Sequence, residues 1–167
     1  MQIPRRKAEE LRRRDEGPLH LTKEALQRLE EKLEYLKHSV PGLAAEAART
    51  AAYGDRSDNA EYKQAKGSLR HANWNILSIQ DQIKRAVIIP SGRNAAGTVQ
   101  MGSIVLVEIN EKQKQFEILG SHETNPAQGR ISYESPLGVV LIGHVQGDVV
   151  EVKTEKGVQK YRILEIR

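Results

Sequence analysis

Three carboxylates at three-residue intervals form the part of this sequence best suited to chemistry. They are Asp55, Asp58 and Glu61, in the string GDRSDNAEY, where one long predicted helix ends and a second begins. Carboxylate oxygens are hard ligands that suit Mg²⁺, and one or two of them usually suffice when a substrate or partner supplies the rest. The same residues fit a structural role, because Asp58 followed by Glu61 is the pattern of a helix N-cap with an acid in the first turn. These residues alone leave both interpretations open.

Two long helices with matching apolar seams are predicted on either side of the acids. The first begins after Thr22, a suitable N-cap, is interrupted near Pro41, and ends near Gly54, which tolerates a left-handed C-cap. The second begins near Asp58. Apolar residues alternate at steps of three and four at Leu26, Leu29, Leu33, Leu36 and Val40, and again at Tyr62, Ala65, Leu69, Ala72, Ile76, Ile79, Ile83 and Ala86. These seams predict an antiparallel coiled-coil hairpin about 48 Å long, with the acids at its tip.

A second group of candidate residues follows the acids along the second helix. Lys63, Lys66 and Arg70 flank its seam on one side, and no acid occurs from Tyr62 to Gln80. A basic stripe of this kind is either a solvated face that keeps the hairpin soluble or a surface for RNA phosphates. Trp74 is expected to pack against the first helix or the linker, and stacking on a base is the weaker interpretation.

The remaining sequence divides into three further segments. Residues 1–17 are charged and lack a sustained period, so we expect a mobile extension before a hairpin over residues 18–88, whose tip lies near 54–61. Residues 89–96 form a linker. Residues 97–167 predict a small α+β domain with a mostly antiparallel sheet. Its strands are expected over 103–109, 115–119, 130–133, 149–153 and 159–166, with a turn at Asn110-Glu111-Lys112 after the first of them. Its one helix is expected over 137–142, and Ser135-Pro136 is expected to begin it.

Composition excludes several function classes. The chain has 167 residues, a net charge of +4 and no cysteine, so neither disulfides nor thiolate metal sites are possible. No apolar run approaches membrane-spanning length and no secretory signal is evident, so a cytoplasmic location and no membrane partner are expected. The five histidines lack metal-ligand spacing, and phosphate-loop and nucleophile-elbow motifs are absent. The tip acids do not make a complete enzyme, so a second molecule must bring the substrate and further ligands.

These motifs resemble those of the bacterial transcript cleavage factors of the GreA/GreB family. GDRSDNAEY is similar to the family's GD-x-x-E-N-A-[ED]-Y tip, and its GDRS portion is closer to the GreB type. Pro41 lies thirteen residues before Gly54, the spacing of that family. The strings Ser135-Pro136, Leu141-Ile142-Gly143 and Gly147-Asp148 match the family's C-terminal signature. The resemblance covers about residues 18–167.

The resemblance implies a specific function for each part. The hairpin would enter the secondary channel of bacterial RNA polymerase, and the FKBP-like C-terminal domain, expected to lack an aromatic-lined pocket, would dock at the channel mouth. Asp55 and Asp58 would help hold a second Mg²⁺ shared with the polymerase, with Glu61 as a third catalytic acid. The polymerase would then hydrolyse the backtracked nascent RNA, whose 3′ segment would contact Lys63, Lys66 and Arg70. The protein itself would be a monomeric accessory factor rather than an enzyme.

One departure from the family pattern leaves an alternative open. Asp58 stands where the family usually has glutamate, and aspartate is one methylene shorter. Because a metal-holding carboxylate is sensitive to errors near 1 Å, this difference bears on activity. The alternative is a homologue that occupies the channel and inhibits the polymerase without efficient cleavage. A purely structural coiled-coil adaptor is a third interpretation, favoured if the tip acids can be removed without effect.

Overall fold

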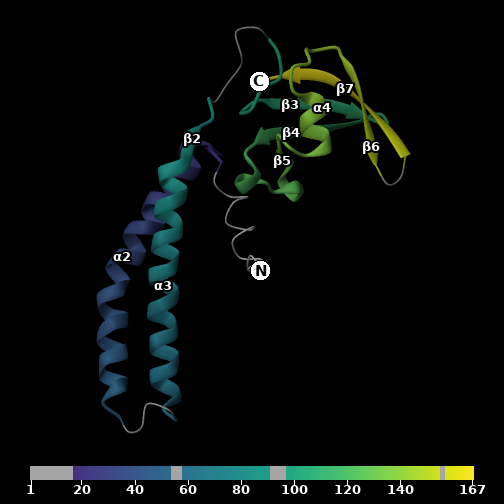
Figure 1. Ribbon diagram of the computed structural model, residues 1–167. Coiled ribbons are helices and arrows are strands. Elements are labelled where there is room, and N and C mark those ends of the chain that lie inside the picture. The colour runs from purple at the N-terminus through teal and green to yellow at the C-terminus, as the bar shows by residue number, and fades with distance from the viewer. Residues whose placement is uncertain (1–16, 54–57, 91–96, 155–156) are drawn as a thin grey trace, which may run out of the picture. The chain divides into compact units, whose positions relative to one another are not determined.

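A long helical hairpin and a curled sheet make up the protein. The computed structural model describes residues 17–53, 58–90, 97–154 and 157–167 (Figure 1). Residues 26–85 form one compact unit, and the described residues before 26 and after 85 form the other. This confirms the predicted α+β class. The expected extension over residues 1–17 lies, except for its last residue, outside the described residues.

The hairpin consists of helix α2 (Lys23–Ala51) and helix α3 (Ala60–Arg85), which run side by side in Figure 1. Thr22 is the N-cap of α2, as predicted, because its Oγ1 accepts a hydrogen bond of 3.2 Å from the backbone N–H of Ala25. The seam residues of both helices are buried or half-buried, while most of the positions between them are exposed. The coiled-coil pattern is therefore confirmed.

Two boundaries of the hairpin differ from the prediction. Pro41 was expected to interrupt the first helix, but α2 continues past it to Ala51. The proline ring is exposed, so the backbone hydrogen bond that it removes lies on the solvent side, where water can replace it. Ala86 was expected to extend the second seam, but α3 ends at Arg85.

Ala86 instead begins a strand that the sequence did not predict. Strand β1 (Leu19–Leu21) pairs in parallel with strand β2 (Ala86–Ile88), so the two chain segments that enter and leave the hairpin lie next to each other. Leu19 and Leu21 are both buried.

The second unit is built on a five-stranded sheet in the order β5-β4-β3-β7-β6. The strands are β3 (Ile104–Ile109), β4 (Lys112–Leu119), β5 (Arg130–Ser132), β6 (Val149–Thr154) and β7 (Gly157–Ile166). All neighbouring strands are antiparallel except β4 and β5. The mostly antiparallel sheet is thus confirmed. Two short 3-10 helices, η1 (Ser121–Glu123) and η2 (Pro126–Gln128), connect β4 to β5.

Helix α4 (Pro136–Leu141) covers the core of this sheet. Ser135 caps it as predicted, accepting a 3.0 Å hydrogen bond from the N–H of Gly138 on its Oγ. Leu141 is fully buried among apolar residues from β3, β4, β6 and β7. This central cluster comprises Val99, Val105, Val107, Ile109, Ile118, Leu141, Val150, Val152, Tyr161, Ile163 and Ile166.

Strand β1 and the residue after it contact η1 and the residue that follows β5, within the same unit. The N–H and the hydroxyl of Thr22 both donate to the carboxylate of Glu123, at 2.7 Å each. The ring of His20 meets that of Tyr133 edge-on, with the centroids 5.7 Å apart. A Cβ at Gly120 would overlap the carbonyl oxygen of His20, so this close approach of two backbones requires glycine.

Candidate functional site

The tip of the hairpin is closed by Asn59. Its Nδ2 donates to the carbonyl oxygen of Thr50, at 2.8 Å, in the last turn of α2, and to that of Tyr53, at 2.6 Å, just after the helix. Its Oδ1 accepts a 2.9 Å hydrogen bond from the N–H of Tyr62 in the first turn of α3. One side chain therefore satisfies backbone groups at the end of one helix and at the start of the next.

This geometry corrects the predicted cap. Asp58 was a candidate N-cap, but the cap of α3 is Asn59. The physical reason is that an amide both accepts and donates hydrogen bonds, whereas an ionised carboxylate only accepts and could not bind the carbonyls of Thr50 and Tyr53. Asp58 therefore does not have the N-cap role that its sequence position suggested.

Small side chains pack the end of the hairpin behind this cap. Ala47 and Ala65 are buried, and Thr50 is only 2% exposed. The Thr50 hydroxyl donates to the carbonyl oxygens of Glu46, at 2.9 Å, and Ala47, at 3.2 Å, so no polar atom of its side chain is left unsatisfied. The base of the tip is therefore held by both packing and hydrogen bonds.

The two described acids at the tip point to solvent. Asp58 and Glu61 are exposed, and Glu61 lies in the first turn of α3, where the helix dipole favours a negative charge. Neither carboxylate has a side-chain hydrogen bond or ion pair to another residue in the described part of the chain. Asp55 lies outside the described residues. The chemistry of the two exposed carboxylates suits Mg²⁺, although the described residues contain no group of three metal ligands.

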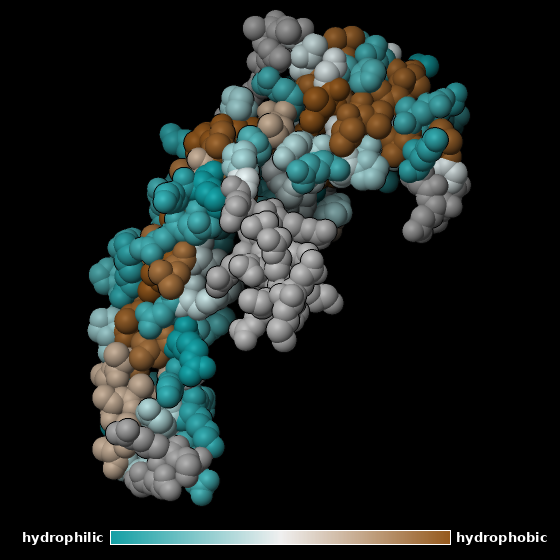
Figure 2. Space-filling model, in the orientation of Figure 1, coloured by the Kyte–Doolittle hydropathy of each residue, from teal (hydrophilic) through white to brown (hydrophobic). Residues whose placement is uncertain are grey.

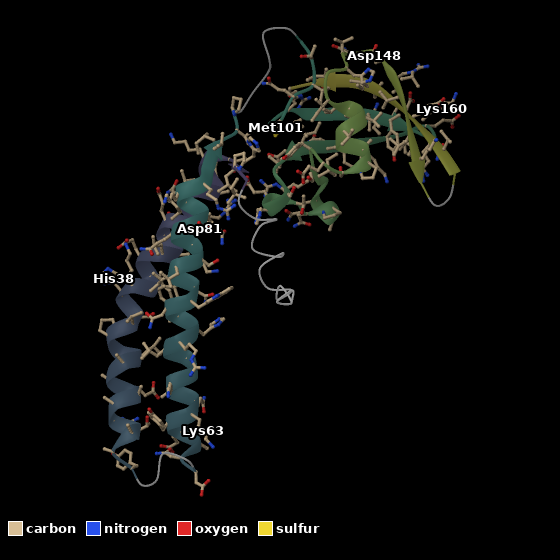
Figure 3. All side chains as sticks on the ribbon, in the orientation of Figure 1. His38, Lys63, Asp81, Met101, Asp148 and Lys160 are labelled. Atoms are coloured by element: carbon tan, nitrogen blue, oxygen red, sulfur yellow. The ribbon has the colours of Figure 1, made fainter. Side chains whose placement is uncertain are left out.

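The three predicted RNA-binding cations extend along α3 from the tip. Lys63, Lys66 and Arg70 are all exposed, and Lys63 lies near the lower end of the helices in Figure 3. The Nζ of Lys66 lies 5.6 Å from the centroid of the Tyr62 ring, a weak cation–π contact. The three side chains therefore share one solvent-facing side of α3, as the spacing predicted.

Trp74 does not pack as expected. Its side chain is 64% exposed, and that of Leu77, one turn further along, is 67% exposed. The prediction that Trp74 packs against the first helix or the linker is wrong. A signal for this was present in the sequence, since Trp74 lies midway between the seam residues Ala72 and Ile76 and so points away from the partner helix.

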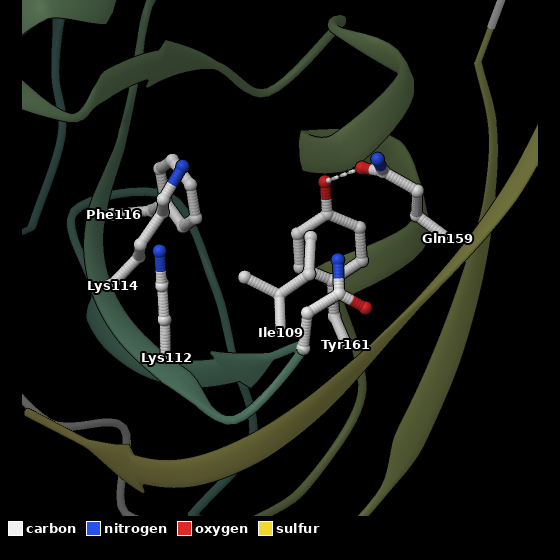
Figure 4. A pocket seen from close by; sticks show the side chains of 7 residues that line it. Ile109, Lys112, Lys114, Phe116, Gln159 and Tyr161 are labelled. Atoms are coloured by element: carbon white, nitrogen blue, oxygen red, sulfur yellow. Dashed lines mark hydrogen bonds between the residues drawn. The ribbon is translucent and has the colours of Figure 1, made fainter. Parts of the chain in front are cut away.

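The sheet unit contains a pocket that sequence reasoning missed (Figure 4). We expected no aromatic-lined pocket, but Phe116 and Tyr161 line a cavity of about 270 Å³ together with Ile109, Asn110, Lys112, Lys114 and Gln159. Figure 4 shows the two lysine side chains running alongside each other, across from Tyr161 and Gln159. The lining comes from three strands, which is why no local motif indicated it. Two ammonium groups beside aromatic rings suit a small anionic group with an apolar body.

A hydrogen-bonded cluster before α4 was also not predicted. Glu134 accepts hydrogen bonds from the hydroxyls of Ser121, at 2.7 Å, and Tyr133, at 2.9 Å. The Ser121 bond and then the Tyr133 bond hold the pKa of the Glu134 carboxyl below its usual value. Glu134 is therefore an ionised, outward-facing acid next to the start of α4.

Comparisons with known proteins place this arrangement in a family. Residues 19–88 match the family described as Transcription elongation factor, N-terminal, and residues 94–167 match that described as Transcription elongation factor, GreA/GreB, C-term. A protein named Transcription elongation factor GreA from Clostridioides difficile (strain 630) is 41% identical over 150 residues, covering 88% of this chain and 94% of that protein. A protein of the same name from Thermoanaerobacter pseudethanolicus is 39% identical over 153 residues, covering 90% and 98%.

Solved structures are also similar. The crystal structure of GreA factor homolog 1 (Gfh1) of Thermus thermophilus is 27% identical, with a TM-score of 0.41, and covers 90% of this chain and 99% of that one. On the sequence matches, the protein belongs to the GreA/GreB family of transcription elongation factors. Among the described residues, no helix has both the length and the apolar character of a membrane span.

Proposed function

We propose that this protein binds bacterial RNA polymerase, inserts its hairpin into the secondary channel and stimulates hydrolysis of backtracked nascent RNA. The observation that carries the proposal is the tip itself. Asp58 is exposed and has no capping role, because Asn59 supplies the cap and holds both helix ends. An acid that contributes nothing to local structure, at the end of helices of 29 and 26 residues, is placed to act on something else.

The chain's own residues would position the reaction rather than complete it. Asp55 and Asp58 would hold Mg²⁺ together with ligands from the polymerase, and Glu61 would add negative charge beside them. When bound, the metal would polarise the scissile phosphate and activate the attacking water, as in other two-metal phosphodiester hydrolyses. Asn59 would keep the backbone of the preceding Asp58 in place, because the Asn59 side chain is hydrogen-bonded to the end of α2 and to the start of α3. Lys63, Lys66 and Arg70 would bind phosphates of the RNA behind the tip.

The test is a cleavage assay on a stalled, backtracked elongation complex, with polymerase binding measured in parallel. Asp55→Ala and Asp58→Ala should each lower the cleavage rate by about hundredfold or more and leave binding nearly unchanged, because misplacing a metal ligand by about 1 Å already costs this much. Asp81→Ala is the matched control, since Asp81 is an exposed acid on α3 remote from the tip. Cleavage at the wild-type rate by the Asp55→Ala, Asp58→Ala double variant would contradict the metal-holding role.

The inhibitory function remains the second candidate, and the aspartate at position 58 is the observation that favours it. Asp58→Glu restores the side chain usual in the family without altering the cap, which belongs to Asn59. In a channel-blocking inhibitor with a weakened tip, this change should uncover cleavage that the natural chain lacks. In a cleavage factor whose tip is adapted to aspartate, it should slow a reaction that is already present. A magnesium titration of the cleavage rate with both chains separates the two.

A further inference from the structure

Five exposed side chains form one continuous stripe along α3. The RNA stripe, as we name it, consists of Lys63, Lys66, Arg70, Trp74 and Leu77. Steps of three, four, four and three residues keep these positions on a single face of a helix that turns 100° per residue. All five are exposed. The stripe begins next to the tip acids and runs away from them.

Trp74 is the member of the stripe that hairpin packing does not explain. Its 64% exposure leaves a large aromatic ring in water, which is unfavourable unless the ring has a partner. Beside it, Leu77 is 67% exposed. The buried seam is supplied by other residues, among them Ala72 and Ile79, so the hairpin does not need Trp74 for its stability.

The charge along the stripe is of one sign. No acid occurs between Glu61 and Asp81, so no acid lies among the three cations or between them and Trp74. Asp81, where the acids resume, is paired with Arg85 through a contact of 2.9 Å between its Oδ2 and the arginine Nε. The stripe is thus a positive segment that ends in an aromatic and an apolar side chain.

Cations followed by an exposed aromatic ring are the combination that binds single-stranded nucleic acid. The cations bind phosphates, and the ring stacks on a base of any sequence. From Lys63 to Trp74 the helix rises about 16 Å, so a bound strand would place more than one nucleotide on the stripe. A protein partner fits less well, because three of the five positions are strongly hydrated cations or long basic groups rather than an apolar anchor cluster.

We propose that Trp74 is a base-stacking platform for single-stranded RNA whose phosphates are bound by Lys63, Lys66 and Arg70. The proposal rests on the proposed function in taking that RNA to be the extruded 3′ segment, and it extends the RNA contact beyond the cations. Trp74 would then act only on RNA long enough to reach it, and it would contribute affinity without sequence preference.

The chain's only tryptophan makes the direct test possible. Fluorescence of the full-length protein is titrated at low salt with a short single-stranded oligoadenylate RNA, and in parallel with an abasic strand of equal length. Stacking predicts saturable quenching by the oligoadenylate and little quenching by the abasic strand, which offers the same phosphates without bases. Equal quenching by both strands, or none by either, would overturn the proposal.

Variants identify the residue responsible. Trp74→Ala should weaken oligoadenylate binding, measured by anisotropy of labelled RNA, about tenfold, and should leave abasic-strand binding unchanged. Trp74→Phe should recover part of the loss, because a ring remains. Tyr35→Ala is the matched control: Tyr35 is a 73% exposed aromatic on the other helix, and its removal should have no effect. Equal affinities of Trp74→Ala and the natural chain for oligoadenylate would show that the indole is not a platform.

The elongation complex separates failure of this inference from failure of the proposed function. With long extruded RNA, Trp74→Ala should slow cleavage several-fold, whereas with RNA too short to reach position 74 it should not. If the natural chain cleaves and Trp74→Ala changes the cleavage rate equally for both RNA lengths, only the stacking role is contradicted. If the natural chain binds oligoadenylate by stacking but never cleaves, the cleavage function is contradicted and the stacking role is supported.

Discussion

The hairpin and the sheet unit are stabilised in different ways. The sheet unit has one central cluster in which Val105, Val107, Ile118, Leu141 and others are completely removed from water. In the hairpin, most seam residues are only half-buried, and the fully buried ones are mainly alanines. The buried apolar contacts of the sheet unit are therefore gathered in one core, whereas those of the hairpin are distributed along its length. In Figure 2 the visible surface of the helices is largely hydrophilic, whereas apolar residues gather on the visible face of the sheet unit.

The difference in packing determines where functional residues can vary without loss of stability. A central core tolerates few changes, because each side chain packs against many others. In the hairpin, each helical turn contributes its own seam residues, so the residues of the outer face and of the tip can change without disturbing the packing. Asp58, Glu61 and the RNA stripe all lie on that free surface, so their residue types can be chosen by chemistry rather than by packing.

The largest expected effect comes from the sheet core. Leu141→Ala should reduce the unfolding free energy of the sheet unit by about 3 kcal/mol, because it leaves a cavity beneath α4 that neighbouring strands cannot fill. Hydrogen exchange should show the loss in the amides of β3, β4 and β7 but in few amides of α2 and α3. An equal loss in all amides would mean that the two units unfold together and are not stabilised separately.

A change at the tip should have a smaller effect, confined to the hairpin. Asn59→Ala removes the cap of α3 and the two hydrogen bonds to the carbonyls of Thr50 and Tyr53, and should destabilise the hairpin by about 2 kcal/mol. Urea unfolding followed by far-ultraviolet circular dichroism, with hydrogen exchange to localise the loss, measures it. The neighbouring Asp58→Ala is the control and should cost less than about 0.5 kcal/mol. Equal losses from both would restore Asp58 as a structural residue.

The smallest expected effect is a titration on the surface of the sheet unit. A hydrogen bond from the His144 ring, 2.8 Å from Asp148, and a second from the N–H of Val145 hold the pKa of the Asp148 carboxyl below its usual value. Because the folded-state pKa is the lower one, this stabilisation is present above the unfolded-state pKa of about 3.9 and is lost as pH falls through the folded value. Carbon-detected NMR of His144→Ala should show the Asp148 pKa rise toward its ordinary value, with the fold unchanged. An unmoved titration would assign the shift to other contacts.

Much of the fold could be predicted because its signals are local. The heptad seams indicated both helices, Ser135-Pro136 indicated the start of α4, and Asn110 and Glu111, both with positive φ, form the turn expected after β3. Strands β1 and β2 were missed because each has three residues and their pairing joins Leu19 to Ala86, far apart in sequence. The pocket around Phe116 and Tyr161 was missed because its lining residues are also far apart in the sequence.

At the tip, the sequence indicated a helix start near Asp58 but did not show which residue caps the second helix. Asp58 and Asn59 are both good N-cap residues, so sequence alone does not say which one caps. The choice depends on the carbonyls of Thr50 and Tyr53, which only an amide can bind as a donor. The exposure of Trp74 could have been predicted without such context, because its position midway between two seam residues places it on the opposite side of the helix.

The parallel pairing of β1 with β2 has a consequence for how such a protein can change over time. The whole hairpin is a detour between two adjacent strands that are themselves paired. Removing or adding one heptad in each helix would alter its length by about 10 Å while returning the chain to the same pairing. The length of the hairpin and the pairing at its base are therefore separately adjustable, and a lineage could lengthen or shorten the hairpin without changing the β1–β2 pairing.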